Sequence, residues 1–121
     1  MKAVNAGERC TMQEITSFDE WQELLEASTQ LVLFVKADHC SVCEGLYPQV
    51  AALESEYPFP FYRVNASAVP EIAGQLALFT APVVLLFHDK KELARFARIV
   101  PMNDLKKRME ELVQWGNVEN A

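Results

Sequence analysis

The sequence predicts a single α/β domain in which helices flank a central mixed β-sheet. Residues 31–35 and 83–87 are apolar runs without polar alternation, which is typical of strands buried on both faces. A helical pattern follows the first run and leads into a strand over 59–64, so this part forms a parallel βαβ unit with a right-handed crossover. The second run turns at residues 89–91 into a strand over 93–99, and this antiparallel hairpin makes the sheet mixed.

The chain begins with a short edge strand over 12–15 and an amphipathic helix. Ser17 and Glu20 have the spacing of a capping box, in which two side chains satisfy backbone N–H groups at a helix start. The apolar residues of the helix recur on one face, and they are Phe18, Trp21, Leu24 and Leu25. We expect this helix to end near Ser28.

A long helix is predicted from Cys40 to Tyr57. Its apolar residues recur at helical spacing, and they are Val42, Leu46, Val50, Leu53 and Tyr57. Pro48 lies inside this pattern. Because a proline removes one backbone hydrogen bond while the apolar period continues beyond it, we expect the helix to bend there rather than to end.

Two further helices complete the predicted fold. Pro70 suits the first turn of a short helix that runs to about Leu78, and residues 79–82 break that helix. A final amphipathic helix starts near Asn103 and stops by Gly116. Its apolar face consists of Leu105, Met109, Leu112 and Val113.

Length, composition and charge limit the class of protein. The chain has 121 residues, 50% of them apolar, which indicates one domain with one core. We assign residues 1–10 to a flexible tail, 11–116 to the domain and 117–121 to a C-terminal tail. A net charge of −6 argues against nucleic-acid binding. No apolar run reaches membrane-spanning length, and residues 1–5 lack the apolar core of a signal peptide. We therefore expect a cytoplasmic protein that binds no membrane. We also expect it to be a monomer.

Cys40 and Cys43 form a Cys-Ser-Val-Cys motif between an apolar strand and the long helix. The first cysteine therefore lies near a helix N-terminus, where unpaired N–H groups and the helix dipole favour a thiolate. The second lies almost one turn on and is close enough to form a disulfide, so the pair can exchange two electrons. In a reducing compartment such a pair is more often catalytic or metal-binding than structural. The third thiol, Cys10, is interpreted as a partly buried or tolerated cysteine.

Two other functions compete with a redox role for the motif. A metal site would need Cys10, His39 or His88 as further ligands, but the sequence has no second CxxC and no paired-histidine motif, so we expect no metal. The domain could also be a non-catalytic interaction module, since a fold alone does not fix a function. Turnover of insulin disulfides separates the enzyme from the module.

The chain resembles the thioredoxin family over residues 11–115. Pro48 stands five residues after the second cysteine, as does the family's helix-kinking proline. Asn65 falls where the family's third strand ends, and Pro82 in Ala81-Pro82 comes seventeen residues later, where the family has a cis-proline. The resemblance implies the thioredoxin fold and thiol–disulfide oxidoreductase activity.

The matching positions imply roles for single residues. Cys40 matches the nucleophile that attacks a protein disulfide, and Cys43 matches the thiol that resolves the mixed disulfide. Pro82 matches the cis-proline that faces the active site, and the backbone of Ala81 would pair with the substrate chain. The resemblance implies no cofactor, but it implies an external reductant such as a thioredoxin reductase.

His39 and Arg98 complete the implied substrate-binding set, although both depart from the family pattern. His39 stands at the tryptophan before the nucleophile, and Arg98 at a glycine that borders the substrate groove. Ser41 and Val42 replace Gly and Pro between the cysteines, and Lys36 replaces a second tryptophan. We therefore expect standard thioredoxin partners to fit poorly.

Phe34 is the departure with the largest chemical consequence. It stands where thioredoxins bury an aspartate that assists proton transfer at the resolving cysteine. Because its strand should be buried on both faces, we expect Phe34 to pack in the core. The resolving step should then depend on water, on Glu44 or on the substrate, and should be slow near neutral pH.

Overall fold

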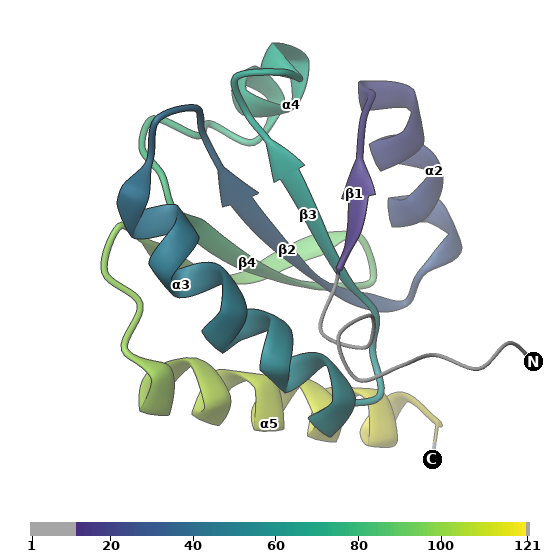
Figure 1. Cartoon of the computed structure of the whole chain (residues 1–121). Coiled ribbons are helices and arrows are strands. Elements are labelled where there is room, and N and C mark those ends of the chain that lie inside the picture. Colours follow the sequence, from purple (N-terminus) through teal and green to yellow (C-terminus); the bar gives the residue numbers. More distant parts are fainter. Residues whose placement is uncertain (1–11, 121) are drawn as a thin grey trace, which may run out of the picture.

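A computed structural model describes residues 12–120 of the chain (Figure 1). The strands are β1 (Gln13–Ile15), β2 (Gln30–Lys36), β3 (Phe61–Asn65), β4 (Val83–His88) and β5 (Lys91–Ala97). The helices are α2 (Phe18–Ala27), α3 (Ser41–Ala51), α4 (Pro70–Gln75) and α5 (Met102–Asn120), and a 3-10 helix, η1 (Ala52–Glu56), follows α3. The predicted tail over 1–10, with Cys10, lies outside the described residues.

The five strands form one mixed sheet in the order β1-β3-β2-β4-β5. Strands β1 and β2 pair with β3 in parallel, whereas β4 pairs antiparallel with both β2 and β5. In this register Val35 of β2 lies opposite Val64 of β3 and Val83 of β4. The central strand therefore has a partner on each side, as its continuous apolar sequence predicts.

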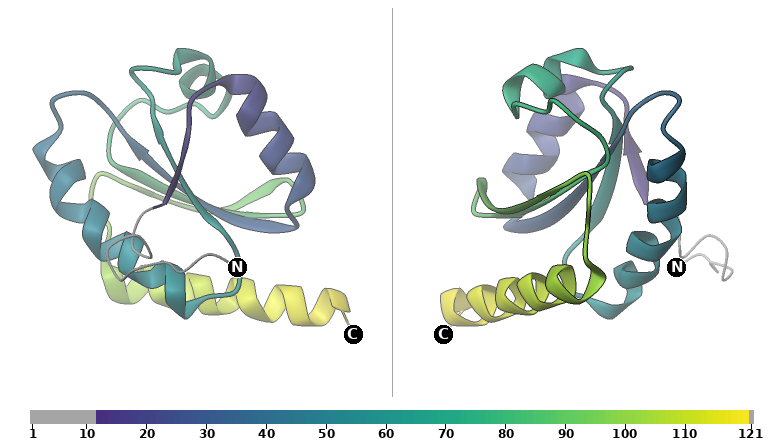
Figure 2. Two further views of the ribbon diagram at one scale, coloured as in Figure 1. Left: turned by 45° about the vertical axis from the view of Figure 1, so that its right-hand side comes forward. Right: turned by 90° about the vertical axis from the view of Figure 1, so that its left-hand side faces the viewer.

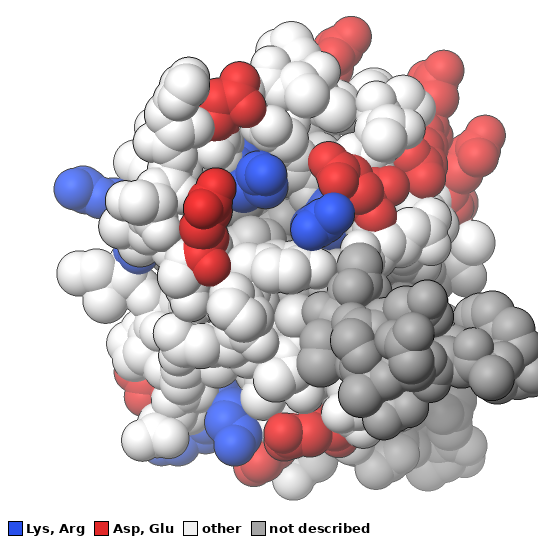
Figure 3. Space-filling model, viewed as in Figure 1, with Lys and Arg blue, Asp and Glu red and all other residues white. Residues whose placement is uncertain are grey.

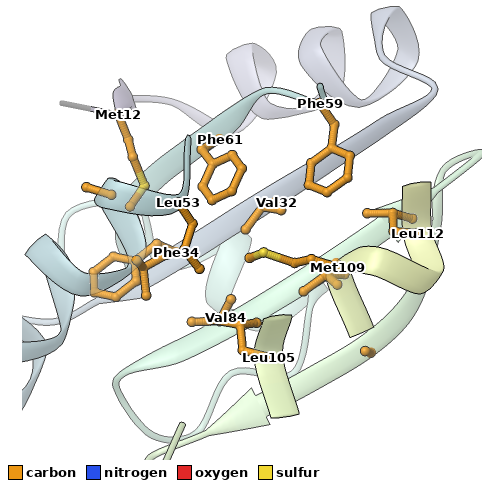
Figure 4. Packing of buried hydrophobic residues seen from close by; sticks show 14 of the residues in the cluster. Met12, Val32, Phe34, Leu53, Phe59, Phe61, Val84, Leu105, Met109 and Leu112 are labelled. Carbon is orange, nitrogen blue, oxygen red and sulfur yellow. The ribbon is translucent and has the colours of Figure 1, made fainter. Parts of the chain in front are cut away.

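Helices cover both faces of the sheet (Figure 2). On one face Val32 and Phe34 of β2 pack with buried residues of α3 and α5, including Leu105, Met109 and Leu112 (Figure 4). On the other face Leu31, Leu33 and Val35 pack with Trp21 of α2 and Ile72 of α4. Each of these apolar side chains is almost completely buried, and such burial stabilises the fold by about 1.5–3 kcal/mol per large side chain.

The long helix predicted up to Tyr57 is shorter in the structure. Its α-helical part ends at Ala51, three residues after Pro48, and the chain continues as the tighter helix η1 to Glu56. A proline has no N–H to donate, so it weakens the α-helical hydrogen-bond ladder at this point. The Ala52 N–H donates to the carbonyl of Pro48, four residues earlier, which is the last α-helical bond before the chain tightens into the 3-10 helix.

Strand β3 begins at Phe61 instead of residue 59 because two prolines precede it. Pro58 and Pro60 cannot donate to a β-ladder. Pro60 joins the sheet only through its carbonyl, which accepts a hydrogen bond from Val32 N at 3.0 Å. Phe59 is nevertheless buried against the core.

Helix α4 and strand β5 end where residues take a positive φ. Helix α4 stops at Gln75 and not at Leu78, since Ala77 has φ 56°. Strand β5 covers 91–97 rather than the predicted 93–99, and it ends before Arg98, which has φ 72°. Positive φ values are incompatible with a regular helix or strand of L-residues.

Helix α5 extends further than predicted, and the hairpin turn is tighter. Gly116 does not stop α5, which continues to Asn120, because a glycine inside a helix costs only about 1 kcal/mol relative to alanine. Asp89 and Lys90 form a two-residue connection between β4 and β5, and both have positive φ values, as such hairpins favour.

The predicted capping box at the start of α2 is present in a shifted form, because Glu20 binds the backbone N–H of Thr16 instead of that of the N-cap residue Ser17. The Ser17 Oγ accepts a hydrogen bond from Glu20 N at 3.1 Å, and the Glu20 carboxylate accepts one from Thr16 N at 2.8 Å. The hydrogen bond from the Thr16 backbone holds the pKa of Glu20 below its ordinary value, because it stabilises the carboxylate form. This helix start fixes β1 and α2 at one edge of the sheet.

Candidate active site

Cys40 is the N-cap residue of α3, just beyond the carboxyl end of β2. Its Sγ accepts a hydrogen bond from Cys43 N at 3.1 Å, and its carbonyl accepts one from Glu44 N at 3.3 Å. A disulfide joins Cys40 and Cys43, whose Cα atoms are 5.2 Å apart. The Cys40 sulfur thus lies where backbone N–H groups and the helix dipole favour negative charge.

The two cysteines differ in their access to solvent. Cys40 is partly buried, whereas Cys43 has only 1% of its surface exposed. A disulfide in another protein can therefore approach Cys40 but not Cys43. The pair lies close enough for a disulfide, as its spacing predicts, and the geometry distinguishes an outer thiol, Cys40, from an inner thiol, Cys43.

The loop before Cys40 is held by the loop that follows β3. The amide of Asn65 donates to the Asp38 carboxylate at 2.9 Å, and Ser67 Oγ accepts from Asp38 N at 3.1 Å. The Ala66 N–H donates to the carbonyl of Lys36 at 2.8 Å. These contacts fix the path of residues 37–39, so the position of Cys40 depends on two neighbouring parallel strands. Of the residues that make these contacts, the sequence singles out Asn65 and Lys36, in both cases for other reasons.

His39 is exposed and has a φ of 58°, in the left-handed region. Few non-glycine residues adopt this conformation, although histidine is among those enriched in it. Backbone strain of this kind often accompanies functional sites. His39 is therefore an exposed residue directly before Cys40 in the chain, and its unusual backbone conformation could not be predicted from the sequence.

The Ala81–Pro82 peptide bond is cis, as the resemblance implied. Since Val83 lies opposite Val35 in the β2–β4 register, Pro82 lies at the same end of the sheet as the loop to Cys40. Arg98 is brought beside it, because Arg98 N donates to the carbonyl of Pro82 at 2.7 Å. Ala81 is partly buried and the Arg98 side chain is exposed.

Exposed apolar side chains surround this end of the molecule. Val42, Phe79 and Ile99 are 61%, 89% and 80% exposed. Val42 lies between the cysteines, Phe79 lies two residues before Ala81, and Ile99 follows Arg98. The sequence alone indicates no functional role for Phe79 or Ile99, because nothing in it shows that an apolar residue is exposed in the fold.

A cavity of about 180 Å³ lies on the inner side of Cys43. Its lining residues are Phe34, Lys36, Cys43, Glu44, Tyr47 and Arg63. On the face of the molecule between α3 and β1, Figure 3 shows a hollow in which basic side chains lie with acidic ones on both sides. Phe34 is completely buried, so the predicted packing role is confirmed. Tyr47 and Arg63 were not predicted to belong to the site.

His88 lies at the opposite end of the sheet from the cysteines. Its register partner on β2 is Gln30, whose amide nitrogen is 3.1 Å from His88 Nδ1, and its ring contacts Trp115. The structure therefore does not bring His88 to Cys40, as the competing metal site would require. Within residues 12–120 no group of three or more His, Cys, Asp or Glu side chains is arranged to hold a metal ion.

Known proteins resemble this chain in both sequence and fold. The thioredoxin family model matches residues 12–111. The chain belongs to the thioredoxin family. Together with the disulfide between Cys40 and Cys43, this membership makes the protein a thiol–disulfide oxidoreductase of thioredoxin fold.

Related sequences and structures agree with this assignment. The thioredoxin-like protein YdfQ of Bacillus subtilis is 32% identical over 81 residues, which cover 66% of this chain and 72% of YdfQ. The thioredoxin of Chlamydia muridarum is 30% identical over 97 residues, 79% of this chain and 94% of that protein. The crystal structure of thioredoxin f2 from Chlamydomonas reinhardtii has a TM-score of 0.75 at 25% identity, covering 84% of this chain and 95% of that one.

A structure of Plasmodium falciparum thioredoxin, at 16% identity, supports the fold alone. It superposes with a TM-score of 0.77 over 83% of this chain and 98% of that one. Among the described residues of this thioredoxin-family chain, no helix has the length and apolar character needed to cross a membrane.

Proposed function

We propose that this thioredoxin-family protein reduces disulfide bonds in other proteins, with Cys40 as the nucleophile and Cys43 as the resolving thiol. The observation that carries the proposal is the asymmetry of the pair. Cys40 is accessible and its sulfur accepts a backbone N–H at the start of α3, whereas Cys43 is buried. A nucleophile must reach its substrate as a thiolate, and only Cys40 meets both conditions.

The reaction has two exchange steps. The Cys40 thiolate attacks one sulfur of the substrate disulfide, and the other substrate sulfur leaves as a thiolate. Cys43 then loses its proton and attacks the Cys40 sulfur of the mixed disulfide. The second substrate sulfur leaves, and the Cys40–Cys43 disulfide remains. Two electrons have passed from the protein dithiol to the substrate.

The substrate chain is proposed to lie along Ala81 and Pro82. An extended segment can add to the backbone there like a strand at a sheet edge. His39 and Arg98 border this path, and both are exposed. The exposed ring of Phe79 and the exposed branched side chains of Ile99 and Val42 would cover apolar side chains of the substrate.

Regeneration of the dithiol needs an external reductant of the thioredoxin reductase class. Such a cycle requires a reducing compartment, and the proposal places the protein in the cytoplasm. The chemistry needs no metal, nucleotide or flavin within this chain, because the two thiols supply both electrons.

Two measurements test the proposal. The reduced protein, resupplied by dithiothreitol, should accelerate reduction of insulin disulfides, and a Cys40→Ala variant should lose this acceleration. A Cys43→Ala variant should trap substrates from a cell extract as mixed disulfides at Cys40, which dithiothreitol releases. If the wild-type protein does not accelerate insulin reduction and Cys43→Ala traps no protein, the domain is a non-catalytic interaction module.

A further inference from the structure

We propose that Arg63 and Lys36 favour the thiolate of the resolving Cys43 across the cavity beside it, and so replace the missing carboxylate as positioning groups. The inference rests on the proposed function, because it concerns the step in which Cys43 attacks the mixed disulfide. A thiol can lose its proton to water when nearby cations stabilise the anion, and no protein base is then needed.

The cavity connects the inner thiol with both cations. Cys43 is 1% exposed, yet it lines the same 180 Å³ space as Lys36 of β2 and Arg63 of β3. The aromatic side chains of Phe34 and Tyr47 and the acidic residue Glu44 of α3 complete the lining. Charges act more strongly on each other beside such low-dielectric surface than in bulk water.

Arg63 is held in place toward this face of the sheet. It lies opposite Phe34 in the β2–β3 register, so both side chains project from the same face. Its Nη2 is 3.1 Å from the Glu14 carboxylate, and its Cζ lies 5.1 Å from the centre of the Tyr47 ring. Its Nε is buried and has no hydrogen-bond acceptor among the described residues, so one donor of a permanently charged group remains uncommitted.

The acidic groups near the cavity are more exposed to solvent than the guanidinium. The side chain of Glu14, which pairs with Arg63, is 41% exposed, against 28% for Arg63 itself. Glu44 is an exposed residue on α3, and the Tyr47 hydroxyl accepts a hydrogen bond from Met12 N at 3.1 Å. Water screens exposed carboxylates most effectively, so on this proposal the two partly buried cations outweigh Glu14 and Glu44 at Cys43.

The chemical step balances without a protein base. The Cys43 proton passes to water in the cavity, and the thiolate attacks the Cys40 sulfur of the mixed disulfide. The new Cys40–Cys43 bond forms as the bond from Cys40 to the substrate breaks, and the substrate sulfur leaves with the electron pair. The cations act before the attack, by increasing the fraction of Cys43 that is ionised.

A small uncharged disulfide isolates this step from substrate docking. Reduced protein in a Cys10→Ser background is mixed with one equivalent of dithiodipyridine in a stopped-flow instrument over a range of pH. Attack by Cys40 releases the first thiopyridone, and attack by Cys43 releases the second. The pH at which the second phase reaches half of its maximal rate reports the ionisation of Cys43.

Loss of either cation should move this midpoint upward. Arg63→Gln and Lys36→Gln should each raise it by roughly half a unit, which slows the second phase about threefold below the midpoint. Arg63→Lys retains the charge and should restore most of the wild-type midpoint. Glu14→Gln removes the partner that partly neutralises Arg63 and should lower the midpoint. Lys107→Gln, an exposed lysine on α5 outside the cavity lining, should leave it unchanged.

Three results would overturn the inference. The first is a midpoint in Arg63→Gln and Lys36→Gln equal to that of Lys107→Gln. The second is a Glu44→Gln variant that slows the second phase at every pH, since Glu44 would then be the proton acceptor. The third is a wild-type protein without any second phase, which would remove the proposed function as well and is thereby distinguished from the other two.

Discussion

Phe34 and Tyr47 meet edge to face next to Cys43, with their ring centroids 5.6 Å apart. Phe34 comes from the central strand β2, and Tyr47 lies one helical turn after Cys43 on α3. An aromatic pair of this geometry contributes about 0.5–1.5 kcal/mol beyond the burial of its area. The two rings therefore stabilise the position of the inner thiol, and they occupy the side from which a carboxylate would accept its proton.

A Phe34→Asp substitution should weaken the fold and accelerate release from the mixed disulfide. Loss of the buried ring should lower the free energy of unfolding by about 3–5 kcal/mol, and desolvation of the acid adds to this cost. Burial should raise the pKa of the introduced carboxyl group, which brings it closer to the proton-accepting range. Urea denaturation measures the first effect, and the second phase with dithiodipyridine measures the second.

Phe34→Asn is the matched control for that substitution. The introduced amide side chain has the same shape as the carboxyl group of Phe34→Asp and leaves a similar packing defect, but it cannot accept the proton of Cys43. Faster release in Phe34→Asp than in Phe34→Asn at the same pH supports a missing base as the limiting factor. Equal or slower release in a folded Phe34→Asp protein would mean that the absent carboxylate does not limit this protein.

Cys40 should be the first thiol to react with limiting iodoacetamide at neutral pH. It is the more accessible of the two active-site cysteines, and its sulfur accepts the Cys43 N–H at the start of α3. Digestion and mass spectrometry of the reduced protein identify the modified residue. Earlier modification of Cys43 or Cys10 would contradict the assignment of Cys40 as nucleophile.

The two central strands were predictable because they have a continuous apolar pattern, whereas the ends of α4 and β5 were not predictable. Residues 31–35 and 83–87 have no polar alternation, and both strands are buried on both faces. The ends of α4 and β5 depend on positive φ values at Ala77 and Arg98, neither of which is a glycine. Backbone conformations that a residue adopts against its preference leave no local sequence signal.

The cysteines and the cis-proline of the candidate site were predictable from their spacing, but the other residues that line the cavity beside Cys43 were not. The positions of Cys40, Cys43 and Pro82 follow a family pattern that can be counted along the chain. Arg63 and Tyr47 reach the cavity only through the β2–β3 register and the packing of α3 on the sheet. Such contacts between distant segments require the assembled fold.

The capping box of α2 should make stability depend on pH through Glu20. Its pKa is lowered in the folded protein relative to the ordinary value of 4.5, chiefly by the hydrogen bond from Thr16 N. Its contribution is therefore present above pH 4.5 and is lost as the pH falls through the lower folded-state pKa. Glu20→Gln should be less stable than wild type at neutral pH, and the difference should shrink in acid.

Ser17→Ala provides the comparison for Glu20→Gln, because it removes the other half of the box without a titratable group. It should cost about 1 kcal/mol of unfolding free energy. This loss of stability should persist at an acidic pH at which the Glu20 carboxyl group is protonated. Urea denaturation of the three proteins over a pH series checks both statements. A Glu20→Gln difference that does not depend on pH would contradict the assigned role of the Thr16 hydrogen bond.

Phe79 should determine how well protein substrates bind but not how fast the thiols react. Its side chain is 89% exposed and lies two residues before Ala81, on the proposed path of the substrate chain. Covering part of this ring in a complex should contribute about 1 kcal/mol, which corresponds to a factor of about five in binding. Phe79→Ser should therefore lower kcat/KM for insulin reduction by about that factor, chiefly through KM.

The small disulfide and a remote aromatic residue separate this role from a loss of structure. Dithiodipyridine is too small to contact Phe79 while it reacts at Cys40, unlike a protein substrate. The rate of its first phase should therefore not change in Phe79→Ser. Trp115 is 50% exposed on α5 and contacts His88 at the other end of the sheet, so Trp115→Ser removes an exposed aromatic side chain far from the cysteines. It should leave kcat/KM for insulin unchanged. If Phe79→Ser slowed both substrates equally, or if Trp115→Ser reduced insulin turnover as much, then Phe79 would not contact the substrate selectively.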